Sequence, residues 1–218
     1  MLAGWPGIGI GLRRSSKQAH SQAIVVDLPG DDANASLNDY ASIVAQAIGK
    51  REDAILVAQS LGGFTAPLVC ADATVRRLVF VNAMIPLPGE TAGAWWDNTG
   101  AVEARVAAAR DGGYSTEFDP QTYFLHDVPE AVLRAGPTRL REQAVAVFKN
   151  RCQFERWPKI PIHVVTSTDD RFFPPTFQRR VARARLHQDV QLVPGGHLVA
   201  LARPAELVDL LLGFEREA

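Results

Sequence analysis

Short apolar runs alternate with longer helical patterns along this chain, and this alternation limits the possible fold more than any other feature. The runs lie at Gln22 to Leu28, Asp53 to Gln59, Arg77 to Asn82, Ile160 to Ser167 and Val190 to Pro194. Continuous runs rich in β-branched residues are typical of parallel strands buried on both faces. Because helical patterns separate the runs, we expect a mostly parallel sheet flanked by helices.

The first helical pattern carries clear start and stop signals. Ser36 stands three residues before Asp39, as in a capping box, and Gly49 follows the last apolar position. The spacing predicts a helix between Ser36 and Gly49. Further helices are expected at Gly62 to Cys70, Pro175 to Leu186 and Pro204 to Phe214.

The alternation of apolar runs and helical patterns stops between the third and fourth runs. The connection there is far longer than the few residues usual in compact domains. Leu87 to Asn150 contains helical patterns punctuated by Gly and Pro. We interpret this stretch as a helical lid inserted into the core. The expected division is residues 1–86 and 151–218 for the core and residues 87–150 for the lid.

Composition excludes several classes of partner. The formal charge of −1 gives no basic surface for nucleic acid or anionic membranes. Cys70 and Cys152 are too few for a disulfide scaffold and lack metal-ligand spacing, so we expect reduced thiols, no metal and a cytoplasmic protein. No apolar stretch reaches the roughly 20 residues of a membrane span. A small neutral or apolar molecule is the expected ligand.

A serine stands between an apolar run and two glycines in "ILVAQSLGGF". Small residues at Ala58 and Gly62 suit a very tight strand-to-helix turn, because a side chain there would collide with neighbouring backbone. Such a turn exposes the Ser60 hydroxyl and lets the Leu61 N–H stabilise an oxyanion. The alternative is that Ser60 merely caps the following helix.

A nucleophilic serine needs a base and an orienting carboxylate. Of the histidines, only His197 follows a strand within a glycine turn, in "LVPGGHLVAL". Asp169 and Asp170 both follow the fourth run directly, and Asp169 could be a turn residue. The order Ser60, Asp170, His197 places each group at the carboxyl end of a different expected strand.

The motifs "VVDLPGDD", "VAQSLGGF", "DDRFFP" and "PGGHLVALARPAEL" resemble the α/β-hydrolase superfamily, particularly small bacterial esterases related to plant methylesterases and hydroxynitrile lyases. In that superfamily the acid stands four residues before a proline, as Asp170 does before Pro174. The usual Gly and His ahead of the nucleophile are Ala58 and Gln59 here.

The resemblance also implies that three strands precede "VVDLPG", the third ending in a loop that donates the second oxyanion N–H. The chain has a short stretch in their place, so the fold is expected to be truncated at this end. A missing strand in the interior of the sheet would leave backbone N–H and C=O groups of its neighbours without hydrogen-bond partners, and each such buried group costs free energy. We expect Met1 to Gly4 to fill part of the gap, Trp5 to lie at the oxyanion site, and a homodimer to cover the rest.

The residues expected to determine the substrate lie mainly in the predicted lid. Trp95, Trp96 and Phe124 could roof an apolar pocket, with His126 and Gln59 as polar neighbours, although aromatic residues in such insertions are more often ordinary packing. These residues predict a small hydrophobic ester.

We therefore expect a serine hydrolase that acts on a small molecule without a cofactor. A lyase or C–C hydrolase with the same triad, and a catalytically impaired ligand-binding member, are the alternatives.

Overall fold

The computed structural model describes residues 9–15, 18–136 and 142–216, with side chains from residue 23 onwards. The chain divides into two compact units. The first comprises Met1–Asn98 and Arg139–Val164, and the second comprises Thr99–Thr138 and Val165–Ala218.

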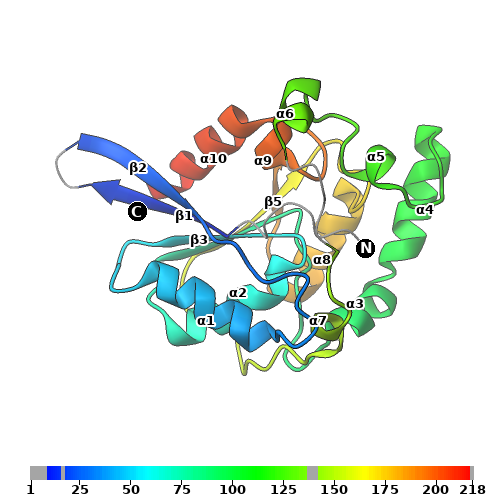
Figure 1. Ribbon diagram of the computed structural model, residues 1–218. Helices are drawn as coiled ribbons and strands as arrows, with labels where there is room; N and C mark the ends of the chain where they lie inside the picture. The colour runs from blue at the N-terminus through cyan, green and yellow to red at the C-terminus, as the bar shows by residue number, and fades with distance from the viewer. Residues whose placement is uncertain (1–8, 16–17, 137–141, 217–218) are drawn as a thin grey trace. The chain divides into compact units, whose positions relative to one another are not determined.

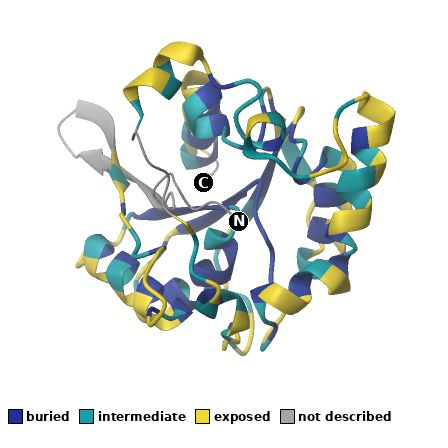
Figure 2. Ribbon diagram, turned by 45° about the vertical axis from the view of Figure 1, so that its right-hand side comes forward, coloured by how far each residue is buried: buried dark blue, intermediate teal, exposed yellow. Residues whose placement is uncertain are grey.

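The core of the first unit is a sheet whose strands follow the order β2 (Gln18–Val25), β1 (Gly9–Ser15), β3, β4 and the beginning of β5 (Ile162–Ser167). Strands β3 (Ile55–Gln59) and β4 (Arg77–Val81) pair in parallel, with Ile55 opposite Arg77, and every residue of both is buried. Figure 2 shows these central strands in dark blue. The continuous apolar runs therefore correctly predicted buried parallel strands at these positions.

Helices α1 (Leu37–Ile48) and α2 (Gly62–Asp72) pack side by side in this unit (Figure 1). The predicted capping box is confirmed. The Asp39 N–H donates to the Ser36 hydroxyl at 3.2 Å, and the Ser36 N–H donates to the Asp39 carboxylate at 2.8 Å. The Ser36 hydroxyl also donates to this carboxylate at 2.7 Å, and this bond, together with the one from the Ser36 N–H, lowers the pKa of Asp39. Gly49 ends the helix at φ 60°.

The beginning of the sheet differs from the expectation. Strands β1 (Gly9–Ser15) and β2 (Gln18–Val25) form an antiparallel hairpin, drawn in blue in Figure 1. The prediction of a buried parallel strand over Gln22 to Leu28 is wrong. The strand ends earlier, runs antiparallel and pairs with β1, and its last residue, Val25, is 58% exposed.

The position beside β3 is taken by Gly9 to Leu12, which pair antiparallel with residues 55–58. A sheet strand needs backbone hydrogen-bond partners, and a glycine-rich segment can supply them because pairing uses only the main chain. The expected filling by Met1 to Gly4 concerns a segment outside the described residues and stays a prediction.

Helices occupy the long connection between β4 and β5, as predicted. They are α3 (Ala92–Thr99), α4 (Ala101–Gly112), α5 (Pro120–Tyr123), α6 (Glu130–Ala135) and α7 (Ala146–Lys149). Helix α7 belongs to the first unit and α4 to α6 belong to the second. The division into a core of residues 1–86 and 151–218 and a lid of residues 87–150 stays a prediction.

The second unit contains the end of β5 (Ile162–Ser167) and β6 (Val190–Val193). The N–H of Thr168 donates to the carbonyl of Val193 at 2.9 Å, just beyond the end of β5. Three helices of this unit follow β5, namely α8 (Pro175–Leu186), α9 (Val199–Ala202) and α10 (Pro204–Arg216). Helices α8 and α10 both pack on β6.

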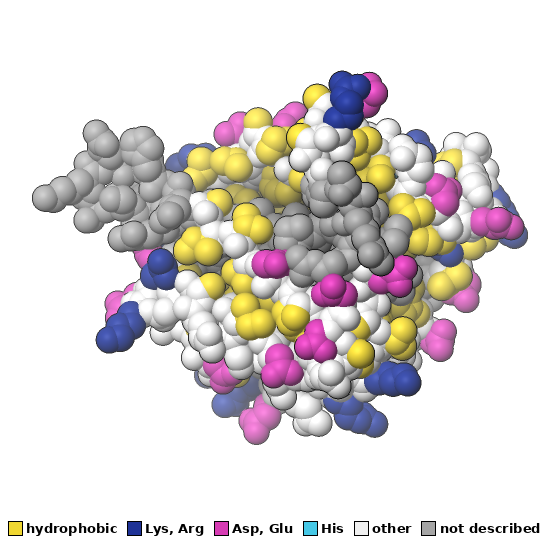
Figure 3. Space-filling view, in the orientation of Figure 1, with side chains coloured by type: hydrophobic (Ala, Val, Ile, Leu, Met, Phe, Trp, Pro, Cys, Tyr) yellow, Lys and Arg dark blue, Asp and Glu magenta, His cyan; other side chains and the backbone are white. Residues whose placement is uncertain are grey.

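The surface carries both signs of charge. On the face drawn in Figure 3, acidic side chains are spread across the middle, and Lys and Arg side chains lie singly around the rim. Within the described ranges, none of the helices combines the length and the apolar character needed to cross a bilayer.

Candidate active site

Ser60 lies in a sharp turn of the first unit, between the end of β3 at Gln59 and the start of α2 at Gly62. Its φ of 51° falls in the left-handed region, which is unfavourable for a residue with a side chain. Leu61 occupies the N-cap position of α2, and its apolar side chain makes no capping hydrogen bond. The positive φ of Ser60 is the geometry expected of the predicted tight turn, and its role as nucleophile stays a prediction.

The small residue that this turn requires is Gly63. A Cβ built at Gly63 would lie 1.9 Å from the carbonyl oxygen of Met84, whereas a Cβ at Gly62 would meet nothing within 4 Å. The expectation that Gly62 is needed to avoid a backbone collision is therefore wrong. The sequence pattern indicated Gly62, two positions after the serine. The close contact instead joins Gly63 to the carbonyl of Met84, which follows the end of β4.

Backbone hydrogen bonds attach the turn to the segment that follows β4. The N–H of Ser60 donates to the carbonyl of Val81 at 3.4 Å, and the N–H of Met84 donates to the carbonyl of Ser60 at 3.0 Å. Asn82, between these partners, also has a positive φ, of 46°. Two strained residues thus lie together where the parallel strands β3 and β4 end.

Asp170 and His197 form a buried pair in the second unit. The Nδ1 atom of His197 lies 2.9 Å from Oδ2 of Asp170, and the two side chains are 2% and 0% exposed, respectively. The other carboxylate oxygen, Oδ1, accepts hydrogen bonds from the backbone N–H groups of Phe172 (2.8 Å) and Phe173 (2.9 Å). Both oxygens of Asp170 are therefore bonded, and the carboxylate is fixed in orientation.

Aromatic rings surround the imidazole. Phe124 stacks on His197 with ring centroids 4.9 Å apart and an interplanar angle of 21°. Phe172 and Phe173 present their edges at 5.1 Å and 5.4 Å. Phe124 is thus packed face to face against the imidazole.

The sequence model of the alpha/beta hydrolase family matches residues 2–210, nearly the whole chain. The chain belongs to the alpha/beta hydrolase family. No curated protein matches it in sequence.

Solved structures of hydrolases share the fold with low sequence identity. A methylesterase from Arabidopsis has a TM-score of 0.66 at 14% identity, over 90% of this chain and 87% of its own. Polyneuridine aldehyde esterase gives 0.64 at 15% identity, over 89% and 87%. A pyrethroid hydrolase from Sphingobium faniae gives 0.63 at 19% identity, over 86% and 83%. These likenesses establish the α/β-hydrolase fold.

In this hydrolase the neighbouring acid, Asp169, has a different environment from Asp170. Its side chain is 59% exposed and lies 3.1 Å from Nε2 of His126, measured from Oδ2. Of the two aspartates left open by the sequence, Asp170 is the one that contacts His197, while Asp169 contacts His126. The His126 side chain is only 8% exposed, and its expected role toward substrate stays a prediction.

The aromatic residues predicted to line a pocket have different surroundings. Trp95 is fully buried in the first unit, and its Nε1 donates to the carbonyl of Ile85 at 3.0 Å, which fits the ordinary-packing alternative. Trp96 is half-buried against it, with ring centroids 5.6 Å apart. Gln59 is buried at the end of β3, next to Ser60. Phe124, also predicted to line the pocket, stacks on His197.

The predicted site residues fall in both units of the hydrolase. Ser60 and Leu61 belong to the first unit, and Asp170 and His197 belong to the second. The approach of Ser60 to His197 stays a prediction, as does the oxyanion role of Leu61. Trp5 lies outside the described residues.

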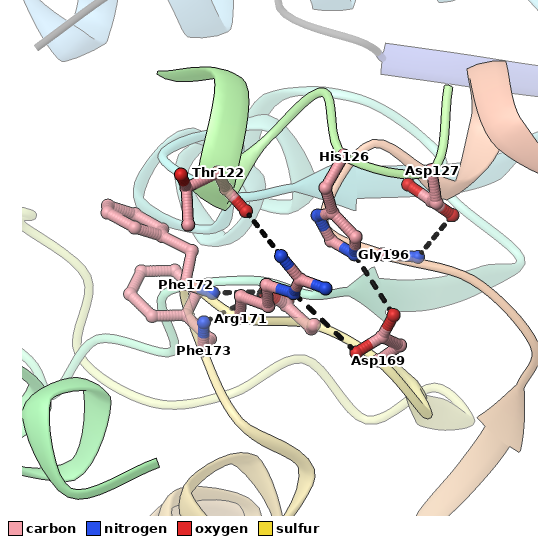
Figure 4. Close-up of polar contacts among 9 residues, drawn as sticks. Thr122, His126, Asp127, Asp169, Arg171, Phe172, Phe173 and Gly196 are labelled. Atoms are coloured by element: carbon pink, nitrogen blue, oxygen red, sulfur yellow. Dashed lines mark hydrogen bonds and ion pairs between the residues drawn. The ribbon is translucent and has the colours of Figure 1, made fainter. Parts of the chain in front are cut away.

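One residue that sequence reasoning missed is Asp127, whose Oδ2 accepts a hydrogen bond from the N–H of Gly196 at 2.7 Å (Figure 4). Gly196 immediately precedes His197. No periodic pattern or motif marks Asp127, because its partner is 69 residues away in the chain.

Proposed function

We propose that this α/β-hydrolase is a serine esterase in which Ser60, His197 and Asp170 act together on a small carboxylic ester. The buried contact between Asp170 and His197 carries the proposal. Burying a carboxylate is costly unless its oxygens are bonded, so a fully bonded Asp–His pair points to a specific task for the imidazole. The strained backbone of Ser60 supports it as the nucleophile.

The pair fixes the tautomer of His197. An ionised carboxylate only accepts hydrogen bonds, so Nδ1 carries the hydrogen and Nε2 keeps a lone pair. In the proposed reaction Nε2 removes the proton from the Ser60 hydroxyl as its oxygen attacks the ester carbonyl. The N–H of Leu61 stabilises the oxyanion in this scheme, and the predicted second donor, at Trp5, lies outside the described residues.

Collapse of the tetrahedral intermediate releases the alcohol, which takes the proton from His197 and leaves an acyl group on Ser60. A water molecule then attacks this acyl-enzyme, with His197 again as the base, and release of the acid restores Ser60. Asp170 orients the ring and stabilises the imidazolium in both halves. The scheme uses only the chain's own residues.

We infer a small and apolar substrate. The surroundings of His197 are aromatic, with Phe124, Phe172 and Phe173 around the ring, and apolar walls favour uncharged groups. The structural neighbours named above are two esterases and a pyrethroid hydrolase, which agrees with ester substrates.

The test is labelling with a fluorophosphonate probe together with a panel of p-nitrophenyl esters of increasing acyl length. Ser60→Ala should abolish labelling and lower kcat by about 10⁶-fold. Ser42→Ala, on an exposed position of α1, is the matched control and should label like the wild type. A folded wild-type protein that neither labels nor hydrolyses any ester would refute the proposal and favour the ligand-binding alternative.

A further inference from the structure

Two consecutive residues of the segment after α5 reach the two loops that carry Asp170 and His197. Asp127 accepts the Gly196 N–H at 2.7 Å, beside His197. His126 lies 3.1 Å from Asp169, beside Asp170. Figure 4 shows the two side chains pointing to different loops from the same short segment. All of these residues belong to the second unit.

The loop before His197 depends on outside contacts for its shape. Gly195 has a φ of 117°, and glycine pairs have many accessible conformations. A Cβ at Gly196 would lie 2.6 Å from Oδ1 of Asp127 and 2.7 Å from Cε1 of His126. The glycine turn therefore lies directly against the Asp127 carboxylate, and a side chain at position 196 would have to displace Asp127 or His126.

The two loops are also bonded to each other and to the same segment. The N–H of Asp169 donates to the carbonyl of Gly195 at 2.9 Å. Arg171 lies with Nε 3.9 Å from Oδ1 of Asp169, and its Nη1 approaches the carbonyl of Thr122 at 3.5 Å. A displacement of the segment would therefore shift both loops.

A carboxylate at position 127 is energetically unfavourable for a contact that only supports the fold. Its second oxygen, Oδ1, is buried and has no hydrogen-bond partner within the described part of the chain. A buried, half-bonded carboxylate destabilises the fold relative to an apolar residue of similar size. A charged acceptor, on the other hand, holds a backbone N–H more firmly than a neutral one.

We propose that Asp127 is a positioning residue for His197. By holding the Gly196 N–H, it fixes the glycine turn and thereby the height and tilt of the imidazole that contacts Asp170. The inference rests on the proposed esterase function, because positioning matters only if His197 moves a proton. A misplacement of about 1 Å at a reacting group can cost on the order of 10²-fold in rate.

The experiment compares Asp127→Leu, which keeps the branched shape but replaces the acceptor oxygens with larger methyl groups, with Asp127→Asn, which keeps an acceptor oxygen. Asp127→Leu should lower kcat by about 100-fold with KM within about twofold of wild type, and should slow fluorophosphonate labelling equally. Asp127→Asn should recover most of this loss. Glu130→Ala, which removes an exposed ion pair with Arg134 a few residues later, is the control and should match wild type.

Equal activity of folded Asp127→Leu and wild type would overturn the inference, and so would an Asn variant no better than Leu. If Asp127→Leu does not fold, the amide of Gly196 in ¹⁵N-glycine-labelled wild type decides: slow hydrogen exchange is expected, and unprotected exchange contradicts the inference. Failure of Ser60→Ala to change labelling would refute the esterase proposal instead, so the two outcomes are distinguishable.

Discussion

The Ser60 turn and the Asp170–His197 pair are held in different ways. The turn is shaped by main-chain geometry, namely the positive φ of Ser60, the closeness of Gly63 to Met84 and hydrogen bonds between backbone groups. The pair is held by side chains, with a carboxylate bonded to an imidazole and rings packed around both. The turn should therefore be disrupted by a substitution that adds an atom to its tightly packed backbone. The pair should be disrupted by a substitution that removes one of its hydrogen-bonding atoms.

Apart from the loss of the nucleophile itself, the largest effect is expected from the pair. Asp170→Asn presents an amide to His197 and favours the wrong tautomer, so kcat for ester hydrolysis should fall by about 10⁴-fold. Asp169→Asn, with an exposed side chain, should stay within about tenfold of wild type. Steady-state kinetics on both variants decides between them. A larger loss for Asp169→Asn would reverse the assignment of the acid.

The turn should respond to one methyl group. Gly63→Ala forces a Cβ against the Met84 carbonyl, so the free energy of unfolding should fall by about 3 kcal/mol. Gly62→Ala has open space and should change it by less than about 1 kcal/mol. Urea unfolding followed by circular dichroism measures both. Equal stability of the two variants would show that the close approach to Met84 is absent.

The aromatic surroundings of His197 should give a smaller effect on rate. Phe124→Leu keeps apolar volume but removes the stacked ring, which should lower kcat by roughly 3- to 10-fold, as expected for an aromatic contact. Phe124→Tyr keeps the ring face and should remain near wild type. If the Leu and Tyr variants have the same kcat, the stacked ring contributes nothing to the rate.

The two cysteines of the first unit should not contribute to activity, and their thiols should react slowly with alkylating reagents. Burial raises the pKa of the Cys70 thiol from 9.0 to about 12, and burial together with the charge of Glu90 does the same for Cys152. Both thiols should resist iodoacetamide at pH 8 in the folded protein, because the thiolate is the reactive form. Mass spectrometry after alkylation would detect a contradiction.

The same pKa shifts set a pH dependence of stability. Because the unfolded thiols ionise first, their contribution is fully present below about pH 9 and declines as the pH rises toward about 12. Replacing either cysteine with alanine should reduce this decline. A wild-type free energy of unfolding that stays flat between pH 9 and 11 would contradict the burial of these thiols.

Several parts of the molecule could be predicted from the sequence because their determinants are local. The capping box of Ser36 and Asp39 lies within one turn of helix, and helix α8 has the predicted bounds, Pro175–Leu186. The buried strands β3 and β4 follow from continuous apolar runs. Such signals need only neighbouring residues, so a single sequence contains them.

Only the tertiary structure decided the remaining features. Whether the run near Val25 pairs in parallel or antiparallel depends on which strand lies beside it, and that is β1. The need for glycine at position 63 comes from the Met84 carbonyl, and the role of Asp127 comes from Gly196. Each depends on a partner distant in the chain, and periodicity or motif spacing reports only on residues that are close together in sequence.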